Sequence, residues 1–293
     1  MKRFPLLLVV GALSAAALNV AGAAPKAGVS KLATASSGGT VTLSGWATFS
    51  GGPIASASDA TGDSLAAQGA PASSHAAAEA SGAELIGADL VYRPELADLF
   101  VRLRIKSMPA VGPLVGDPTV LYGLRTVVSG VPIEIRMQST ATGAQFGLFE
   151  CGSETGCTQA PATISGGYGT TGVEVVAAVP LAAFATIPKV HLSPGDKIGT
   201  PIAFTARAAF AAGAVNDSLY MDDLVLIKAA KVPIPVASVK VTIGKTTKSA
   251  ALKNGTFSAS FPASVFGGEK SAIAVTKTCL GSSCVTQKWT VSR

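Results

Sequence analysis

Alternating apolar and polar side chains dominate the chain between residues 85 and 108. In the segment LADLFVRLRI, the apolar residues Leu99, Val101, Leu103 and Ile105 occupy every second position. This period of two predicts a strand with one buried face and one solvated face. The preceding segment ELIGADLVY predicts a partner strand, and Arg93-Pro94-Glu95 predicts the turn between them.

Short strand-like segments separated by turn residues continue to the C-terminus. In VPIEIRMQ, three residues are predicted to face the core and three to face outward: Ile133, Ile135 and Met137 inward, and Glu134, Arg136 and Gln138 outward. Strands at a spacing of about 8–12 residues, with almost no long helical period, are typical of β-sandwiches. The sequence therefore predicts an all-β protein, with a large antiparallel β-sandwich followed by a small Ig-like β-sandwich.

The N-terminus has the pattern of a secretory signal peptide. Met1-Lys2-Arg3 is basic, an apolar run follows, and Ala21-Gly22-Ala23 is a cleavage site of the A-x-A type. No later segment has the roughly 20 unbroken apolar residues that span a bilayer. We therefore expect residues 1–23 to be removed and the mature protein to be secreted to the cell envelope without a transmembrane segment.

Composition suggests the remaining boundaries. Residues 24–39 are rich in small and polar side chains, which predicts a flexible linker. The large sandwich is predicted over 40–230, with TVTLSGWATF as its first strand, Gly45 as a bulge, and an Ala/Ser/Gly-rich loop at about 51–83. Closely spaced prolines predict a linker at 231–236, and five strand-like segments predict the basic Ig-like domain at 237–293.

The four cysteines form two close pairs in the sequence, Cys151 with Cys157 and Cys279 with Cys284. Four cysteines allow three pairings, and we predict two local disulfides because both pairs bracket short loops in an exported chain. A zinc site is disfavoured, because the cysteine spacing is wrong and the two histidines, His75 and His191, are remote in sequence.

Charge is distributed unevenly. Residues 228–293 carry ten Lys/Arg and one acidic residue, whereas residues 24–227 carry 11 basic and 16 acidic residues. Such asymmetry suggests attraction to an external polyanion or docking of one domain on the other. The alternative is that the lysines only keep the small domain soluble and its edges unpaired. The candidate polyanion-binding residues are Lys240, Lys245, Lys248, Lys253 and Lys288.

Oxygen-rich turns raise the hypothesis of a structural calcium ion. The candidate ligands are Asp59, Asp63, Asp217, Asp222 and Asp223. The first and last strands of a sandwich often lie side by side, which would bring these carboxylates together for a site with six to eight ligands, roughly. The alternative is that these residues simply form turns. No other cofactor is predicted.

The sequence contains no recognisable catalytic motif. His75 and His191 lie in loops, and Glu134, Glu150, Glu154 and Glu174 occupy ordinary strand or loop positions. A histidine base needs a converging nucleophile and carboxylate, and a glycosidase needs two carboxylates across a cleft. We therefore predict that the protein is not an enzyme, with a hydrolase of unrecognised site as an alternative.

The DATGDS turn, the following GADL strand and LADLFVRLRI resemble the β-sandwich modules of exported bacterial proteins, which are similar in style to carbohydrate-binding and DOMON-type domains. The likeness covers about residues 40–227, and the C-terminal part resembles a bacterial Ig-like module. The resemblance implies a non-catalytic binding or accessory role, with calcium sometimes structural. The chain departs from it in having few aromatic residues for a sugar-binding platform.

These observations lead to one functional hypothesis with alternatives. We expect an exported, non-catalytic binding or accessory protein that recognises a polysaccharide or polyanionic wall polymer at the cell envelope. Tyr122 and Tyr168 are the candidate ligand contacts of the large domain. The alternative is a structural or accessory protein that binds only other proteins, such as a surface assembly or a protease. Sparse aromatics and few arginines disfavour nucleic acid.

Overall fold

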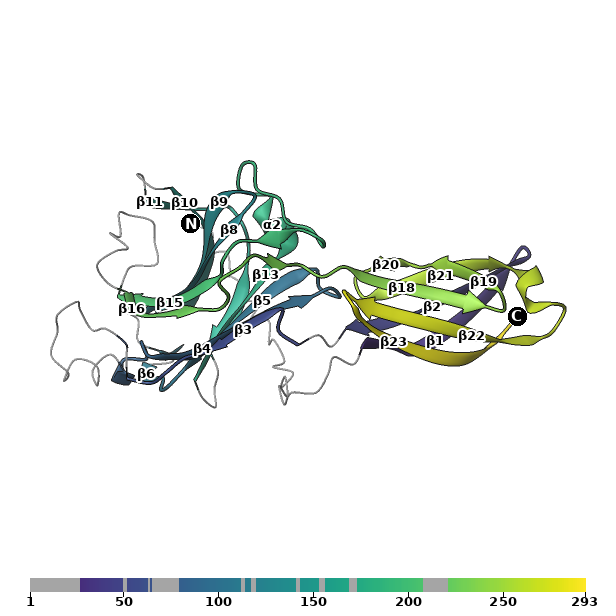
Figure 1. The fold of residues 1–293 in the computed structure, drawn as a ribbon, viewed down its shortest axis with the longest axis horizontal. Coiled ribbons are helices and arrows are strands. Elements are labelled where there is room, and N and C mark those ends of the chain that lie inside the picture. Colours follow the sequence, from purple (N-terminus) through teal and green to yellow (C-terminus); the bar gives the residue numbers. More distant parts are fainter. Residues whose placement is uncertain are drawn as a thin grey trace, which may run out of the picture.

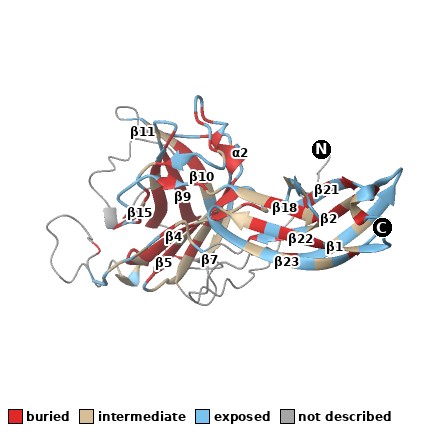
Figure 2. Cartoon of the chain, turned by 45° about the vertical axis from the view of Figure 1, so that its right-hand side comes forward, coloured by how far each residue is buried: buried red, intermediate tan, exposed pale blue. Residues whose placement is uncertain are grey.

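The computed structural model describes residues 27–49, 52–62, 64, 79–111, 114–116, 120–140, 143–152, 156–168, 173–207 and 221–293. Their regular secondary structure is almost entirely β-strand, so the predicted all-β class is confirmed. They form two units that lie end to end along the longest axis of the molecule, each with its own buried core (Figures 1 and 2). The predicted signal peptide lies outside the described residues. Within them, no helix is long and apolar enough to cross a membrane.

The small unit is built from both ends of the described chain, residues 27–49 and 237–293. Its first sheet has the strand order β1-β2-β21-β20 and its second the order β19-β18-β22-β23. The strands of the first sheet are β1 (Ala27–Ser37), β2 (Thr40–Phe49), β20 (Ala251–Lys253) and β21 (Thr256–Pro262). Those of the second are β18 (Ala237–Ile243), β19 (Thr246–Ser249), β22 (Ser271–Leu280) and β23 (Ser283–Ser292), with a short 3-10 helix, η1 (Ala263–Phe266), before β22.

This arrangement corrects two predictions. The expected flexible linker at 24–39 is wrong from residue 27 onward, because that segment forms β1. The segment TVTLSGWATF forms β2, which pairs with β21 of the small unit instead of starting the large sandwich. The large sandwich is therefore inserted between β2 and β18. Composition did not reveal β1 because an edge strand needs few large apolar residues. Val29 is its buried apolar side chain, and the strand is otherwise held by backbone hydrogen bonds to β2.

Gly45 was predicted to mark a bulge, and the structure places that bulge on the opposite strand. The register of β1 against β2 shifts between Val29, which pairs with Ala47, and Leu32, which pairs with Gly45. A Cβ at Gly45 would lie 2.4 Å from the carbonyl oxygen of Lys31. Glycine is therefore required here for the close approach of the bulged backbone.

Side chains close both open seams between the sheets of the small unit. At one seam, the amide of Gln287 accepts a hydrogen bond from the backbone N–H of Val29 and donates one to its carbonyl. At the other, Nζ of Lys248 donates to the carbonyl of Ser260 and lies 5.5 Å from the centre of the Phe261 ring. The edges β1 and β19 are thereby tied to the facing sheets.

The large unit, residues 52–235, contains two sheets of six and five strands. The six-stranded sheet has the order β11-β10-β9-β8-β15-β16 and the five-stranded sheet the order β12-β13-β5-β4-β3. The former comprises β8 (Val120–Val128), β9 (Val131–Thr140), β10 (Gly143–Gly152), β11 (Gly156–Gln159), β15 (Ile202–Arg207) and β16 (Met221–Leu226). The latter comprises β3 (Ala55–Ser58), β4 (Leu85–Arg93), β5 (Asp98–Ile105), β12 (Ser165–Tyr168) and β13 (Glu174–Pro180). Small additions are β6 (Ala110–Val111) with β7 (Leu114–Val115), β14 (Lys197–Ile198) with β17 (Val232–Pro233), and the helical turn α2 (Leu181–Phe184).

The predicted hairpin of residues 85–105 is confirmed as β4 and β5. Alternate residues from Leu99 to Ile105 are buried in the core of the large unit. Its turn is fixed by Arg93, whose Nε and Nη2 lie 2.8 and 2.6 Å from the two carboxylate oxygens of Asp98. A bidentate pair of this kind is geometrically specific and holds the turn in place.

The tip of this hairpin lies against the small unit. A Cβ at Gly255, in the turn between β20 and β21, would lie 2.9 Å from Cζ2 of Trp46 and 3.1 Å from Cβ of Glu95. Burial raises the pKa of the Glu95 carboxyl, and the charge of Asp98 adds to this effect, while Arg93 and a backbone hydrogen bond oppose it. The two units therefore meet at a partly buried carboxyl group.

Candidate functional site

A buried charged cluster lies on the face of the six-stranded sheet that points away from the main core. Glu134 is 1% exposed and Arg136 is 2% exposed. Nε and Nη2 of Arg125 lie 2.7 and 2.5 Å from Oε1 of Glu134, and Nε and Nη2 of Arg136 lie 2.8 and 2.7 Å from Oε2. One carboxylate is thus shared by two guanidinium groups.

Strand register builds this cluster directly. Arg125 on β8 lies opposite Glu134 on β9, and Phe149 on β10 lies opposite Glu134 on its other side. Arg136 is two residues further along β9 and therefore shares the same face. Its guanidinium carbon lies 4.5 Å from the centre of the Phe149 ring, a cation–π contact that also excludes water.

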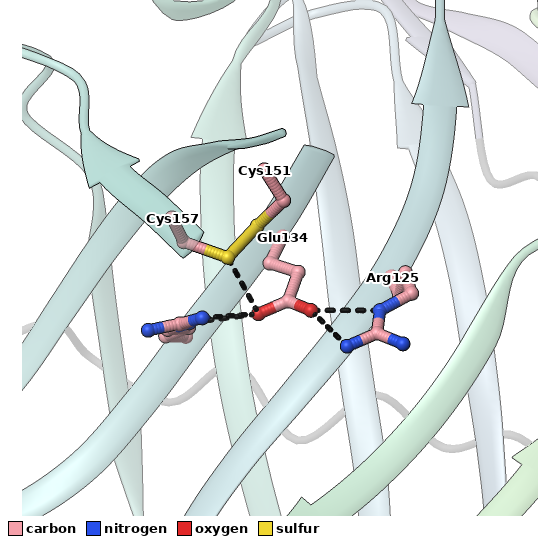
Figure 3. Close-up of a disulfide and its surroundings, with 5 residues drawn as sticks. Arg125, Glu134, Cys151 and Cys157 are labelled. Atoms are coloured by element: carbon pink, nitrogen blue, oxygen red, sulfur yellow. Dashed lines mark hydrogen bonds and ion pairs between the residues drawn. A yellow bond between two sulfur atoms is a disulfide. The ribbon is translucent and has the colours of Figure 1, made fainter. Parts of the chain in front are cut away.

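The disulfide between Cys151 and Cys157 covers the cluster. It joins β10 to β11 at a directly paired position, and Sγ of Cys157 lies 3.8 Å from Oε2 of Glu134 (Figure 3). This is a packing contact, because a disulfide sulfur carries no proton to donate. The second predicted disulfide, Cys279 with Cys284, is also formed, between β22 and β23. The local cysteine pairing is therefore confirmed.

The prediction that Glu134, Arg136 and Gln138 face solvent is wrong. They do point away from the main core, as the alternation indicated, but all three are buried. The reason is that Phe149, Cys157, Leu121 and Phe204 form a second, smaller apolar cluster on that side of the sheet. Alternation predicts the face of a residue, but not what covers that face.

The cluster does not form a metal site. Among the residues that the structure describes, Glu134, Cys151 and Cys157 are the three groups close enough together to ligate one ion. Both sulfurs are consumed by the disulfide, and the carboxylate is bound by two arginines. A metal would need thiolates and a carboxylate with available lone pairs.

Two of the segments that carry candidate calcium ligands lie next to each other in the fold. Asp59 follows β3, which packs against β16, so the two ends of the large sandwich do lie together as expected. Oδ1 of Asp59 accepts a hydrogen bond of 3.0 Å from the N–H of Ala60. Asp63 and Asp217 lie outside the described residues. Asp222 and Asp223 lie on β16, but the structure does not describe their side chains.

A residue that sequence reasoning missed organises the predicted calcium loop. The buried carboxylate of Glu84 accepts hydrogen bonds from the backbone N–H groups of Gly62 and Ser64. Burial by itself raises the pKa of Glu84. These two bonds, the Ser64 side chain and the charge of Lys106 together outweigh it and lower that pKa. An acidic residue just before an apolar strand is only a weak sequence signal for such a structural role, because the fold decides which backbone groups its carboxylate reaches.

Tyr122 and Tyr168 are brought together, but not as a ligand platform. Tyr122 is completely buried and its hydroxyl donates to the carbonyl of Gly82 at 3.0 Å. Its ring lies 6.0 Å from that of Tyr168 in an edge-on arrangement, and the Tyr168 ring lies 6.4 Å from that of Phe146. Burial raises the pKa of the Tyr168 hydroxyl. The prediction that Tyr122 contacts a ligand is wrong, because it belongs to the core.

The five candidate lysines are all exposed, but they do not share one surface. Lys240 and Lys288 lie on the outer face of the second sheet of the small unit. The register places Lys277, a lysine outside the predicted set, directly opposite Lys240. The remaining three lie elsewhere: Lys245 in the turn between β18 and β19, Lys253 at the end of β20, and Lys248 bound across the seam to Ser260.

No catalytic constellation forms around the described histidine. Oγ of Ser193 lies 3.5 and 3.4 Å from the two ring nitrogens of His191, at the limit of hydrogen bonding. The neighbouring carboxylate, Asp196, accepts from the backbone N–H of Ser193 and not from the ring. His75 lies outside the described residues.

No protein-family model matches this chain, and no curated protein is significantly similar to it.

Proposed function

We propose that this is an exported, non-catalytic protein of the cell envelope that binds a polyanionic polymer through the small unit. The observation that carries the proposal is a row of lysines on the outer face of the second sheet. Lys240 on β18 and Lys277 on β22 are direct cross-strand partners, and Lys288 on β23 lies diagonally beside Lys277. We call these three residues the lysine row.

The positions of these lysines argue against a role in solubility alone. β18 and β22 are the two central strands of their sheet, so Lys240 and Lys277 protect no edge. Like charges placed directly opposite each other destabilise a sheet. A favourable interaction with an external anion would offset that cost.

The charge of the whole small unit supports the same function. Its two segments contain nine Lys/Arg and a single acidic residue, Glu269. That residue follows η1 and precedes β22, so it lies off the outer face that carries the lysine row. Because both tryptophans lie elsewhere, Trp289 inside the unit and Trp46 at the junction with the large unit, binding would depend on charge and not on stacking.

The test is binding of the full mature chain to dextran sulfate, with neutral dextran as the matched polymer. The triple variant Lys240→Gln/Lys277→Gln/Lys288→Gln should bind more than roughly tenfold more weakly at low salt, since each lysine contributes about 1 kcal/mol there. Added salt of about 0.5 M should abolish wild-type binding.

The control variant also loses three positive charges, but at lysines that lie outside the outer face of the second sheet. The variant Lys31→Gln/Lys245→Gln/Lys253→Gln should bind dextran sulfate within about threefold of the wild type at low salt. Equal losses in the two variants would mean that net charge alone matters, and would refute the lysine row as a site. Cleavage after Ala23, seen by mass spectrometry of the exported protein, would support the proposed localisation.

A further inference from the structure

A groove of about 560 Å³ lies at the end of the six-stranded sheet, in the large unit. It is lined by the end of β8, the turn between β8 and β9, the segment 197–202 and Lys231. This volume falls in the range of small-molecule binding sites. The groove therefore has the size to hold a molecule such as a mono- or disaccharide.

The charge of the groove is opposite to that of the unit around it. Arg125, Lys197 and Lys231 line it, and no acidic residue does. The large unit as a whole contains 16 acidic and 11 basic residues. Among the described residues, neither Lys197 nor Lys231 forms an ion pair. Three cations from segments far apart in sequence thus converge on one groove.

Arg125 is held in place by the buried cluster described above. Glu134 binds its Nε and Nη2 edge, while 36% of the side chain remains exposed. Arg136 occupies the other oxygen of Glu134, so the two arginines hold this carboxylate from both sides. The carboxylate thereby fixes the orientation of the Arg125 guanidinium group at the wall of the groove.

The walls of the groove are fixed by hydrogen bonds. The turn residues Ser129 and Gly130 have positive φ angles of 52° and 83°, and the Ser129 hydroxyl donates to the carbonyl of His191 at 2.9 Å. The N–H of Gly199 donates to the carbonyl of Val127 at 2.6 Å, and the Thr126 hydroxyl donates to the carbonyl of Gly199 at 3.0 Å. The 197–202 segment is therefore tied to the end of β8, and the groove is preformed.

We propose that this groove binds an anionic sugar unit, with its carboxylate or phosphate group against Arg125, Lys197 and Lys231. The aliphatic side chains of Val127, Pro132 and Ile202 would contact the C–H surface of the ring. No aromatic ring lines the groove, so neutral sugars lack a stacking partner and affinity depends on charge. This site lies on a different unit from the lysine row, and neither proposal depends on the other.

Calorimetric titration of the full mature chain tests the proposal with two matched pairs of probes. D-galacturonate is compared with D-galactose, and D-glucose 6-phosphate with D-glucose. We expect at least one anion to bind at low salt, its neutral partner not to bind, and affinity to fall when salt is raised to about 0.3 M. The anion that binds more tightly identifies the charged group.

Two charge-matched variants make the result specific. Lys197→Gln/Lys231→Gln should weaken binding of the anionic probe by at least roughly tenfold, whereas Lys240→Gln/Lys277→Gln should leave it unchanged. Both variants alter exposed side chains, and equal melting temperatures would confirm folding. Equal binding of the neutral sugar, no binding of either anion at low salt, or no effect of the Lys197/Lys231 variant would overturn the proposal.

Discussion

Replacing Glu134 by Gln should destabilise the large unit severely. Glutamine keeps the shape of the side chain but removes the charge that compensates Arg136, which is 2% exposed. Among the described residues, the Phe149 ring at 4.5 Å also contacts Arg136, but a cation–π contact, about 2 kcal/mol when desolvated, does not replace the lost carboxylate. Removing one member of a buried ion pair costs about 3–5 kcal/mol, because the other charge stays buried without compensation.

Calorimetry should show this loss in one unit only. For a unit of this size, a loss of about 3 kcal/mol lowers the melting temperature by roughly 6–12 °C. We expect this shift in the transition of the large unit, while that of the small unit, which has a separate core, stays unchanged. Urea denaturation should show the same loss at an unchanged m-value.

Glu174→Gln is the matched control. Glu174 also faces an arginine, but it is 44% exposed and lies 3.6 Å from Arg102. Its replacement should cost less than about 1 kcal/mol, as for other surface pairs. The double variant Glu134→Gln/Arg136→Met should regain much of the loss, because it removes both buried charges. If Glu134→Gln cost no more than the control, the cluster would not be a buried ion network and the reasoning would fail.

Three further predictions concern the small unit and its junction. Burial raises the pKa of Glu95 in the folded state, so folding favours the protonated carboxyl. The resulting stabilisation is complete below about pH 4, where the carboxyl of the unfolded chain is also protonated, and it is lost as pH rises through the folded-state pKa. Glu95→Gln should therefore raise the melting temperature at pH 7 and not at about pH 3.5. A gain at both pH values would contradict the raised pKa of the Glu95 carboxyl. Cys279→Ala/Cys284→Ala should lower the free energy of unfolding of the small unit by about 2 kcal/mol, the chain-entropy value for so short a loop, measured by urea denaturation. Gly45→Ala should cost about 1–3 kcal/mol, because its Cβ would meet the Lys31 carbonyl, and hydrogen exchange should rise first in β1.

Local patterns in the sequence determined much of the architecture. The alternation from Leu99 to Ile105 identified a half-buried strand, because side chains of a strand alternate between its faces whatever the fold. The disulfides followed from spacing, since cysteines that bracket a short hairpin loop are brought opposite each other by the hairpin itself. The all-β class, the hairpin of residues 85–105 and both disulfides were therefore predictable.

Only the tertiary structure decided what lies across from each strand. Residues 27–37 look like a linker in isolation, yet they become a strand because β2 provides a hydrogen-bonding partner. Glu134 has the sequence context of a solvent-facing residue, yet it is buried because β10 and β11 carry Phe149 and a disulfide over it. Arg125, Lys197 and Lys231 share a groove although 106 positions separate the first from the last. Side-chain periodicity is a local property of the backbone, whereas burial and charge clustering depend on contacts between distant segments, which the sequence of each segment does not specify.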